Sequence, residues 1–415
     1  MEQKTPFLKT LSALATPTVL VAALGYFVDI YDLILFGMVR RASLATLGFT
    51  GDAAKATGDF LLDMQMIGLL LGGIFWGVLG DKKGRRSVLF GSIVLYSVAN
   101  IANGFVTNIP MYALLRFVAG VGLAGELGAG ITLVNETMSK ENRGWGTMLV
   151  VSVGALGAVA AAFVGNVFGS WQISYWVGGG LGLLLLLLRV GTFESGMFQE
   201  MTEKTGVFRG NLRLLFSNKK RLLTYLACIG AGLPVWFSIG ILVLLGSEFM
   251  QSIHVEPAAN MNNVIAYAYA GLAFGDFLSA WLSQVLRSRK KVVAFYIGLS
   301  LVFTIVFTHS QGISATGFYL LYFLLGCCNG YWVTIVTMAS EQFGTNIRAT
   351  VTTTVPNFIR GAVIPITLLF RFFEKYLQNN LFAALIVGVV CALVAAGSVY
   401  FLKDTFGRDL DFLEQ

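Results

Sequence analysis

The chain has 415 residues, of which 56% are hydrophobic and only 12% are charged, and its mean hydropathy is +0.74. Soluble domains carry about 25% charged residues, so this composition excludes a water-soluble globular enzyme and a disordered chain. It predicts an all-α membrane protein with many spans. The net charge of +7 does not indicate nucleic-acid binding, because the basic residues lie in short segments between apolar stretches, where they set membrane topology.

A membrane-spanning helix needs about 20 mostly apolar residues, and the sequence contains twelve such stretches. We predict spans at residues 17–40, 60–79, 87–107, 110–135, 145–168, 171–189, 222–247, 263–284, 292–309, 316–340, 350–371 and 381–402. The first is not a cleaved leader, because it starts late and carries two aspartates. Segments on the side of the N-terminus hold 22 of the 29 Lys and Arg residues, and the opposite loops hold five. This bias predicts cytoplasmic termini, in a bacterial inner membrane.

A long basic stretch separates the first six spans from the last six. We predict four parts: an N-terminal six-helix bundle (1–190), a cytoplasmic linker (191–221), a C-terminal six-helix bundle (222–402) and a cytoplasmic tail (403–415). The halves are partly repeated, because Glu136 and Arg143 follow the fourth span as Glu341 and Arg348 follow the tenth, 205 residues later. Two pseudo-symmetric bundles of this kind hold substrate between them near the middle of the membrane.

Residues 77–86, GVLGDKKGRR, resemble the loop signature G-x-L-x-D-(R/K)-x-G-R-R of the major facilitator superfamily. Two further stretches are similar to its metabolite:proton symporter branch. They are the first span around Asp29 and the fourth span from Arg116 to Glu126, and residues 194–199 resemble the segment that follows the sixth span in that branch. The resemblance implies the twelve-helix fold of that superfamily and a carboxylate or zwitterion as substrate.

Five charged residues fall near the centres of predicted spans: Asp29, Asp32, Glu126, Asp276 and Arg360. A central Asp, Lys or Arg costs about 2.5–3.5 kcal/mol on insertion scales, so these side chains must face a cavity or one another. We predict that Asp29, Asp32 and Glu126 carry the coupled proton. Asp29 and Asp32 are three residues apart on one helix face and would resist being ionised together. The alternative is that they neutralise an arginine, and that Glu126 is a buried hydrogen-bond acceptor.

We predict that Arg360 binds an anionic group of the substrate, because a guanidinium presents a planar fork to a carboxylate. The alternative is a permanent ion pair with Asp276 or with an aspartate of the first span. Arg116 matches an arginine of the resembled branch and is a candidate partner for a first-span carboxylate. The other candidate substrate-binding residues are polar or aromatic side chains within spans: Asn357, Asn329, Tyr26, Tyr331, Trp332, Trp236 and Asp276.

The loop signature and its partial repeat predict a latch at the inner side of the membrane that holds the outward-facing state. Anchoring by the positive-inside effect would explain its arginines but not its acids. The candidate gating residues are Gly77, Asp81, Arg85, Arg86, Glu136, Arg143, Glu341 and Arg348.

These features together predict a proton-coupled symporter of a small organic anion or zwitterion that works by alternating access. An exporter or exchanger, a metal-chelate carrier and a ligand sensor that does not transport remain alternatives. The sequence lacks hydrolase and paired metal-ligand motifs, and its two His and four Cys residues show no metal-site spacing, so we expect no enzyme activity, cofactor or resident metal. The expected partners of the monomer are the substrate, protons and the lipid bilayer, without nucleic acid.

Overall fold

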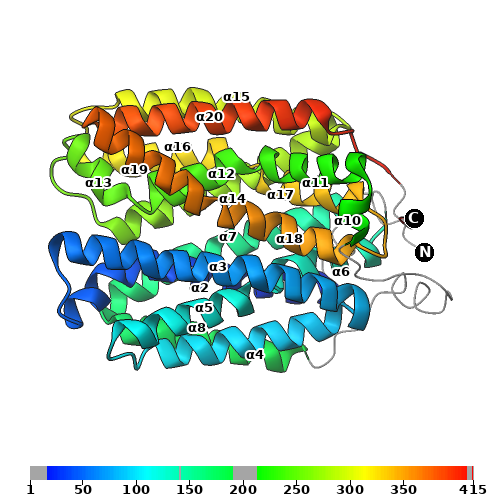
Figure 1. Ribbon diagram of the computed structural model, residues 1–415, viewed down its shortest axis with the longest axis horizontal. Coiled ribbons are helices and arrows are strands. Elements are labelled where there is room, and N and C mark those ends of the chain that lie inside the picture. The colour runs from blue at the N-terminus through cyan, green and yellow to red at the C-terminus, as the bar shows by residue number, and fades with distance from the viewer. Residues whose placement is uncertain (1–15, 140–141, 190–212, 409–413, 415) are drawn as a thin grey trace, which may run out of the picture.

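The computed structural model describes residues 16–139, 142–189, 213–408 and 414, and these residues contain helices and no strand. The predicted segment at 194–199 and most of the predicted linker at 191–221 lie outside the described residues. The helices run along the long axis of the molecule in two groups that lie one above the other in Figure 1. We call the group from α2 to α8 the N half and the group from α10 to α20 the C half.

The N half is built from seven helices that make up the first six predicted spans. They are α2 (Pro17–Thr46), α3 (Gly51–Lys83), α4 (Arg85–Asn103), α5 (Ile109–Leu123), α6 (Glu126–Thr137), α7 (Arg143–Phe168) and α8 (Trp171–Leu188). Asn108 and Ser170 each cap the helix that follows them, by accepting a hydrogen bond from a backbone N–H of its first turn. Such caps explain where α5 and α8 begin.

The C half contains the last six predicted spans and two short helices outside them. Its elements are α10 (Arg213–Ser217), α11 (Lys219–Ala231), α12 (Leu233–Phe237), the π-helix η2 (Ser238–Val243), α13 (Gly246–Ser252), α14 (Met261–Val285), α15 (Arg289–His309), α16 (Ala315–Asn329), α17 (Trp332–Gln342), α18 (Arg348–Gly361), α19 (Val363–Leu377) and α20 (Asn380–Phe401). Asn218, Asn260, Ser288, Ser314 and Asn379 cap helices in the same way.

Within the described residues, eleven helical segments are long and apolar enough to cross a membrane, and each matches a predicted span. The remaining span is α4, whose 19 residues include Arg85, Arg86, Asn100 and Asn103. These side chains lower its hydropathy, yet α4 packs along both α5 and α8 inside the N half. The prediction of a twelve-helix membrane fold is therefore confirmed.

Four of the spans are interrupted near their middle, and two of these, the seventh and the eleventh, carry a proline in the sequence, Pro234 and Pro356. The fourth span breaks between α5 and α6, the tenth between α16 and α17, and the eleventh between α18 and α19. In the seventh span, Pro234 lies in the first turn of α12, and the π-helix η2 follows it. A break leaves backbone groups without a partner inside their own helix, and these groups are then open to side chains of other spans.

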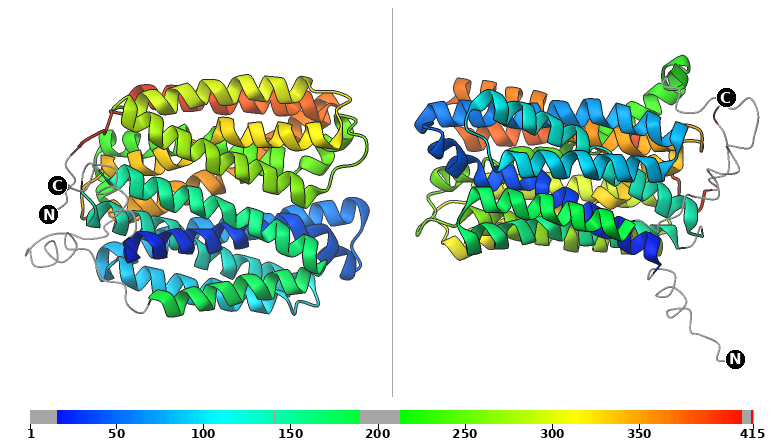
Figure 2. Two further views of the ribbon diagram at one scale, coloured as in Figure 1. Left: turned by 180° about the vertical axis from the view of Figure 1, so that it is seen from behind. Right: turned by 90° about the horizontal axis from the view of Figure 1, so that it is seen from below.

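The two halves meet along two pairs of helices. In the first pair α14 lies along α7, and in the second α18 lies along α3, near the middle of the molecule in Figures 1 and 2. Gly77 lies on the second contact, where a Cβ atom would come within 2.9 Å of the Thr350 Cα. Backbones that approach this closely are typical of helix packing in membranes.

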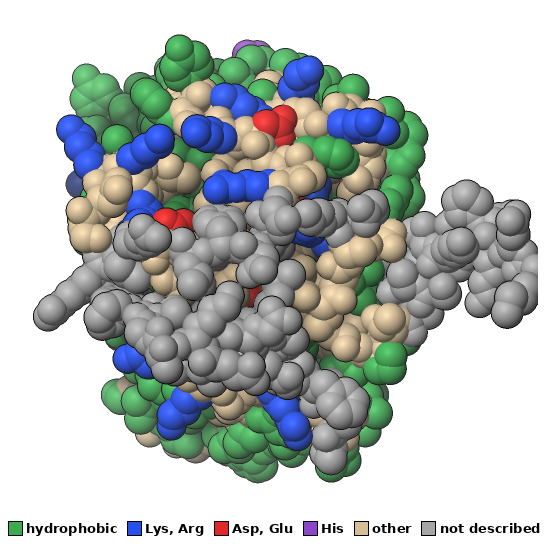
Figure 3. All heavy atoms as spheres, turned by 90° about the vertical axis from the view of Figure 1, so that its right-hand side faces the viewer, with side chains coloured by type: hydrophobic (Ala, Val, Ile, Leu, Met, Phe, Trp, Pro, Cys, Tyr) green, Lys and Arg blue, Asp and Glu red, His purple; other side chains and the backbone are tan. Residues whose placement is uncertain are grey.

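One end of the molecule carries the loop between α3 and α4, the short helix α10 and residue 414, and we call it the basic end. The opposite end, which carries α13, is called the distal end. Lys and Arg side chains gather on the visible face of the basic end, many of them over the C half (Figure 3). The charge bias in the sequence thus corresponds to one end of the structure.

Close packing of α2 against α7 predicts that a single methyl group at their crossing is harmful. A Cβ atom on Gly157 would lie 2.0 Å from the Phe27 carbonyl oxygen, whereas nothing lies within 4 Å of a Cβ atom on Gly180. We expect Gly157→Ala to lower the free energy of unfolding by about 1–3 kcal/mol and Gly180→Ala to leave it unchanged or raise it slightly. Thermal unfolding in detergent measures both, and equal midpoints would contradict this account of the packing.

Candidate functional site

An ion pair joins the two halves at the centre of the molecule. The Arg360 Nη2 atom, on α18, lies 3.2 Å from the Asp29 Oδ2 atom, on α2. Both side chains are at most 1% exposed. Such a pair is stable away from water because each charge neutralises the other, and removing one partner would leave a buried charge uncompensated. The structure thus brings together a predicted proton-carrying residue and the predicted substrate-binding residue.

Three aromatic side chains surround this ion pair. Trp236 and Tyr26 present their rings to the Arg360 guanidinium, with its central carbon 5.8 Å and 6.0 Å from the ring centroids. The Trp332 Nε1 atom donates a hydrogen bond of 3.0 Å to the Tyr26 hydroxyl across the two halves. Ring faces stabilise a guanidinium by cation–π attraction. We call Asp29, Arg360, Tyr26, Trp236 and Trp332 the central cluster.

Asp32 points away from the central cluster into the N half, although it lies only three residues from Asp29. A Cβ atom on Gly178 of α8 would lie 2.2 Å from one Asp32 carboxylate oxygen, so this carboxylate faces α8. Neither oxygen accepts a hydrogen bond of normal geometry from the described residues. The cation that acts on it electrostatically is Arg116. The structure therefore divides the two aspartates between different surroundings.

Arg116 is fully buried between aromatic rings of the N half. Its guanidinium lies 4.9 Å from the centroid of Phe36 and 5.8 Å from that of Tyr175. It donates no hydrogen bond of normal geometry to any described residue. Arg116 is thus held by cation–π contacts and acts on Asp32 through space without closing a direct ion pair.

Glu126 forms an ion pair with Arg189, a residue that our sequence analysis did not select. The Arg189 Nη1 atom donates to Glu126 Oε2 at 2.9 Å and to the Leu89 carbonyl at 2.9 Å, and its Nη2 atom donates to Glu126 Oε1. Both side chains pack against Gly25 of α2. In the sequence, Arg189 is the last residue of an apolar span, and the next basic residue is Lys204. This position at the end of a span is the signal that distinguishes Arg189 from the basic residues of the loop.

The other predicted substrate-binding residues lie at helix breaks or inside the C half. Asn357 donates a hydrogen bond of 2.8 Å to the Ala124 carbonyl, at the break between α5 and α6. Asp276 accepts one of 3.0 Å from the Val333 N–H at the start of α17. Asn329 accepts one from Ser300, and the Tyr331 hydroxyl donates to the Ala231 carbonyl. Asn329 and Tyr331 therefore face other spans of the C half.

At the basic end, Asp81 of the N half holds the start of α18 in the C half. Its carboxylate accepts hydrogen bonds from the Ala349 N–H, the Thr350 N–H and the Thr350 hydroxyl, at 3.1, 2.9 and 2.6 Å. A carboxylate at a helix N-terminus satisfies free N–H groups and is favoured by the helix dipole. The Arg85 Nη2 atom lies 3.6 Å from the same carboxylate.

Glu136 is a second contact between the halves at this end. Its Oε1 atom lies 2.8 Å from Arg85 Nη2, in its own half, and 3.2 Å from Arg348 Nη1, in the other half. Arg85 also reaches the Thr345 carbonyl of the C half at 3.4 Å. The structure thus joins four of the predicted gating residues, Asp81, Arg85, Glu136 and Arg348, in one buried group that spans the two halves.

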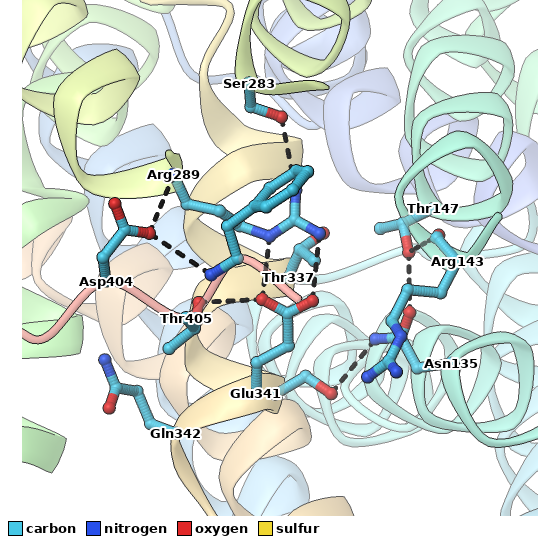
Figure 4. A network of polar contacts seen from close by, with 12 residues as sticks. Asn135, Arg143, Thr147, Ser283, Arg289, Thr337, Glu341, Gln342, Asp404 and Thr405 are labelled. Carbon is cyan, nitrogen blue, oxygen red and sulfur yellow. Dashed lines mark hydrogen bonds and ion pairs between the residues drawn. The ribbon is translucent and has the colours of Figure 1, made fainter. Parts of the chain in front are cut away.

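Glu341, the counterpart of Glu136 in the repeat, stays within its own half. Figure 4 shows its carboxylate between Arg289 and Thr405. Both carboxylate oxygens accept from Arg289, at 2.8 and 2.9 Å, and one also accepts from the Thr405 hydroxyl at 2.8 Å. Asp404 continues this network, because it accepts hydrogen bonds from the Ser288 hydroxyl and the Arg289 N–H.

The remaining predicted gating residues flank these groups. Gly77 allows α3 and α18 to approach, as described above. The Arg86 guanidinium lies over the Phe90 ring at 5.4 Å. Arg143 is buried at the start of α7, and its carbonyl accepts from Thr147, which also donates to Asn135 in the network of Figure 4.

The distal end has its own contacts between the halves, and the sequence analysis did not predict them. Lys55 of α3 lies 3.2 Å from Glu248 of α13, and Asp59 of α3 lies 3.6 Å from Arg371 of α19. Arg371 also forms a two-pronged pair with Glu248, at 2.8 and 3.0 Å. Burial opposes ionisation of Glu248, but the hydrogen bonds from Arg371 hold the pKa of this carboxyl below its usual range.

The halves therefore touch at the basic end, at the centre and at the distal end. In this arrangement, contacts between the halves lie on both sides of the central ion pair. Alternating opening of two ends around a fixed central site is the physical requirement for carrying a solute against a gradient.

The comparisons with known proteins agree with this fold. A family model described as the Major Facilitator Superfamily matches residues 18–365. A solved proton:xylose symporter superposes with a TM-score of 0.73 at 16% identity and covers 95% of this chain and 97% of its own. A fucose:proton symporter from Escherichia coli superposes with a TM-score of 0.70 at 15% identity, over 94% of this chain and 99% of its own.

Three relatives in sequence are transporters. A niacin transporter of Acinetobacter baylyi is 26% identical over 372 residues, which cover 79% of this chain and 80% of the relative. A 4-hydroxybenzoate transporter of Pseudomonas putida is 25% identical, with 80% of each chain covered. A 3-(3-hydroxy-phenyl)propionate transporter of Escherichia coli is 29% identical, with 71% of this chain and 72% of the relative covered.

The contacts of Asp81 predict that its charge holds the basic end closed. We expect Asp81→Asn to weaken closure by about 1.5–3 kcal/mol, the usual range for a hydrogen bond to a charged group. Spin labels at the exposed residues Ser87 and Arg287, in a background without the native cysteines, would then report longer distances. Asp404→Asn is the matched control, because its contacts stay within the C half; a similar lengthening in both variants would contradict the prediction.

The distal contacts predict a pH dependence with a definite sign. Because the pKa of Glu248 is lowered by its partners, its contribution to distal closure is present above the ordinary carboxyl pKa and is lost as the pH falls through the lowered value. At pH 7 we expect Glu248→Gln to lengthen the distance between labels at Ala53 and Gln378, and Glu256→Gln, an exposed control, to leave it unchanged. An unchanged distance in Glu248→Gln would show that closure does not depend on this charge.

Proposed function

Because the chain belongs to the major facilitator superfamily, we propose that this membrane transporter is a proton-coupled symporter of a small organic anion or zwitterion. The Arg360–Asp29 ion pair is the observation that carries the proposal. It joins the two halves, lies in the middle of the spans and combines a cation suited to a carboxylate with an acid suited to a proton.

The proposed coupling is a competition for one guanidinium. A substrate carboxylate that binds Arg360 displaces Asp29 from its partner. Asp29 would then be an unpaired buried anion, which is costly away from water, and a proton removes that cost. Substrate and proton are thus bound together, and release of one favours release of the other. Asp32 and Glu126 are the further proton-carrying groups in this proposal. Arg116 acts electrostatically on Asp32, and Arg189 forms an ion pair with Glu126.

A monocyclic aromatic carboxylate is the substrate class that we propose within this function. The relatives are named for niacin, 4-hydroxybenzoate and 3-(3-hydroxy-phenyl)propionate, each a carboxylic acid on or near one ring. In this chain the rings of Trp236, Trp332 and Tyr26 stand beside Arg360. Aromatic side chains bind flat rings by stacking and edge contacts, while the guanidinium fixes the carboxylate.

The proposed setting is a monomer in a bacterial inner membrane, with the basic end in the cytoplasm. The gathering of Lys and Arg at that end supports this orientation. The proposed parts remain two six-helix bundles at 1–190 and 222–402, a linker at 191–221 and a tail at 403–415. Asn357, Asn329, Tyr331 and Asp276 are kept as proposed secondary contributors to the substrate site, and the buried contacts of the basic end as the inner latch.

Transport by the purified protein in liposomes tests the proposal. With an alkaline interior we expect benzoate, nicotinate or 4-hydroxybenzoate to accumulate faster than in protein-free liposomes, where the neutral acid crosses the bilayer unaided, and a protonophore to abolish this excess. Arg360→Lys should raise KM by roughly ten- to a hundredfold, since a charge-assisted hydrogen bond contributes about 1.5–3 kcal/mol. Arg287→Lys, at an exposed arginine, is the matched control. Accumulation that survives collapse of the pH gradient would defeat the coupling.

A second variant separates proton coupling from substrate binding. We expect Asp29→Asn to retain exchange of labelled for unlabelled substrate across the membrane, because Arg360 stays free to bind the carboxylate. It should lose accumulation driven by the pH gradient, because an amide takes up no proton. If a folded Asp29→Asn variant lost both exchange and pH-driven accumulation, Asp29 would belong to the substrate site. If it retained both, Asp29 would play no part in proton coupling.

A further inference from the structure

A cavity opens at the basic end of the C half, away from the central cluster. It has a volume of about 460 Å³ and lies where α11 begins and α20 ends. These two helices pack side by side. None of its lining residues belongs to the central cluster or to the buried group that joins the two halves, so the cavity is separate from the transport site.

Basic side chains dominate the charge of this cavity. Lys220 and Arg221 come from the first turn of α11, and Lys403 and Arg408 follow α20; the acid on the wall is Glu414, which pairs with Arg221 at 3.0 Å. The ammonium groups of Lys220 and Lys403 form no hydrogen bond or ion pair with the described residues. The lining therefore carries an excess of positive charge, with two free cations.

The same cavity has an apolar wall that faces outward. Leu223 and Phe401 line it and are 54% and 76% exposed. Leu223 lies one turn into a candidate membrane span, and Phe401 is the last residue of another. Exposed apolar side chains at the end of a span lie at the level where the hydrocarbon of a bilayer meets its headgroups. A ligand here thus meets cations on one side and apolar side chains on the other.

We propose that this cavity binds the headgroup of an anionic phospholipid, with its phosphate between Lys220 and Lys403 and its acyl chains along Leu223 and Phe401. Basic pockets between spans are suited to such headgroups. A free phosphate compound would use the cations alone and would gain nothing from the apolar wall. The juxtaposition of both features at one membrane level is what favours a lipid.

Native mass spectrometry of the full-length protein tests the site, with phosphatidylglycerol and phosphatidylcholine of identical acyl chains as probes. We expect at least fivefold more bound phosphatidylglycerol than phosphatidylcholine at equal concentrations. The double variant Lys220→Gln/Lys403→Gln should lose most of this preference. Lys83→Gln/Lys291→Gln is the matched control, because it removes two exposed charges from the same end outside the cavity and should keep the preference.

Three outcomes would overturn the proposal. Equal binding of the two lipids by the unaltered protein would show that no anionic site exists. An equal loss in the two double variants would assign the preference to the general positive field of the basic end. Displacement of phosphatidylglycerol by an equal concentration of glycerol phosphate would assign the cavity to a soluble anion. Thermal unfolding without added lipid checks that each variant is folded. The comparison of the two lipids uses the unaltered protein, so it tests the proposal even if a variant fails to fold.

Discussion

A buried charge in a membrane protein is tolerated only where another group of the protein compensates it, and at the centre of this molecule the compensating groups come from different halves. Arg360 of the C half depends on Asp29 of the N half. Neither half could keep its own charge in a dry interior if the two separated without water or a ligand replacing the lost partner. The central ion pair therefore makes the two bundles one structure, and it makes any opening sensitive to what enters between them.

The end contacts show that the two halves are not equivalent, although their sequences repeat. At the basic end, acids of the N half, Asp81 and Glu136, reach the C half, whereas Glu341 remains with Arg289 in its own half. The sequence analysis placed Glu136 and Glu341 together among the residues of one inner latch. Asp81 has no acidic counterpart in the loop between α14 and α15. Within the part of the chain that the structure describes, α18 is therefore the helix whose N-terminus is capped by a carboxylate from across the interface.

The sequence predicted the elements of the fold far better than the partners within it. Long apolar runs and the loop signature were sufficient for twelve spans, because lipid imposes length and hydrophobicity on each helix separately. Partners depend on how helices rotate and pack, which no single span encodes. Asp29 and Asp32 share a face of an ideal helix, yet one reaches α18 and the other faces α8. Arg189 stands at the end of an apolar span, but nothing near it in the sequence points to its partner Glu126, which lies 63 residues away in the chain.

The buried charged side chains around the centre suggest a physical reason why a proton would accompany the substrate anion in the proposed symport. Three cations, Arg116, Arg189 and Arg360, are buried in the spans together with three acids, Asp32, Glu126 and Asp29, which face them directly or through space. A further acid, Asp276, lies against the N-terminus of α17, whose helix dipole compensates part of its charge. Each of these three arginines is thus already opposed by an acid, and none of them is left over for a substrate carboxylate. Binding of a monoanion adds one negative charge to a water-poor space, and uptake of one proton by an acid that the substrate displaces restores the balance. The coupling that we propose would thus follow from electrostatic neutrality, whichever of the acids holds the proton at a given moment.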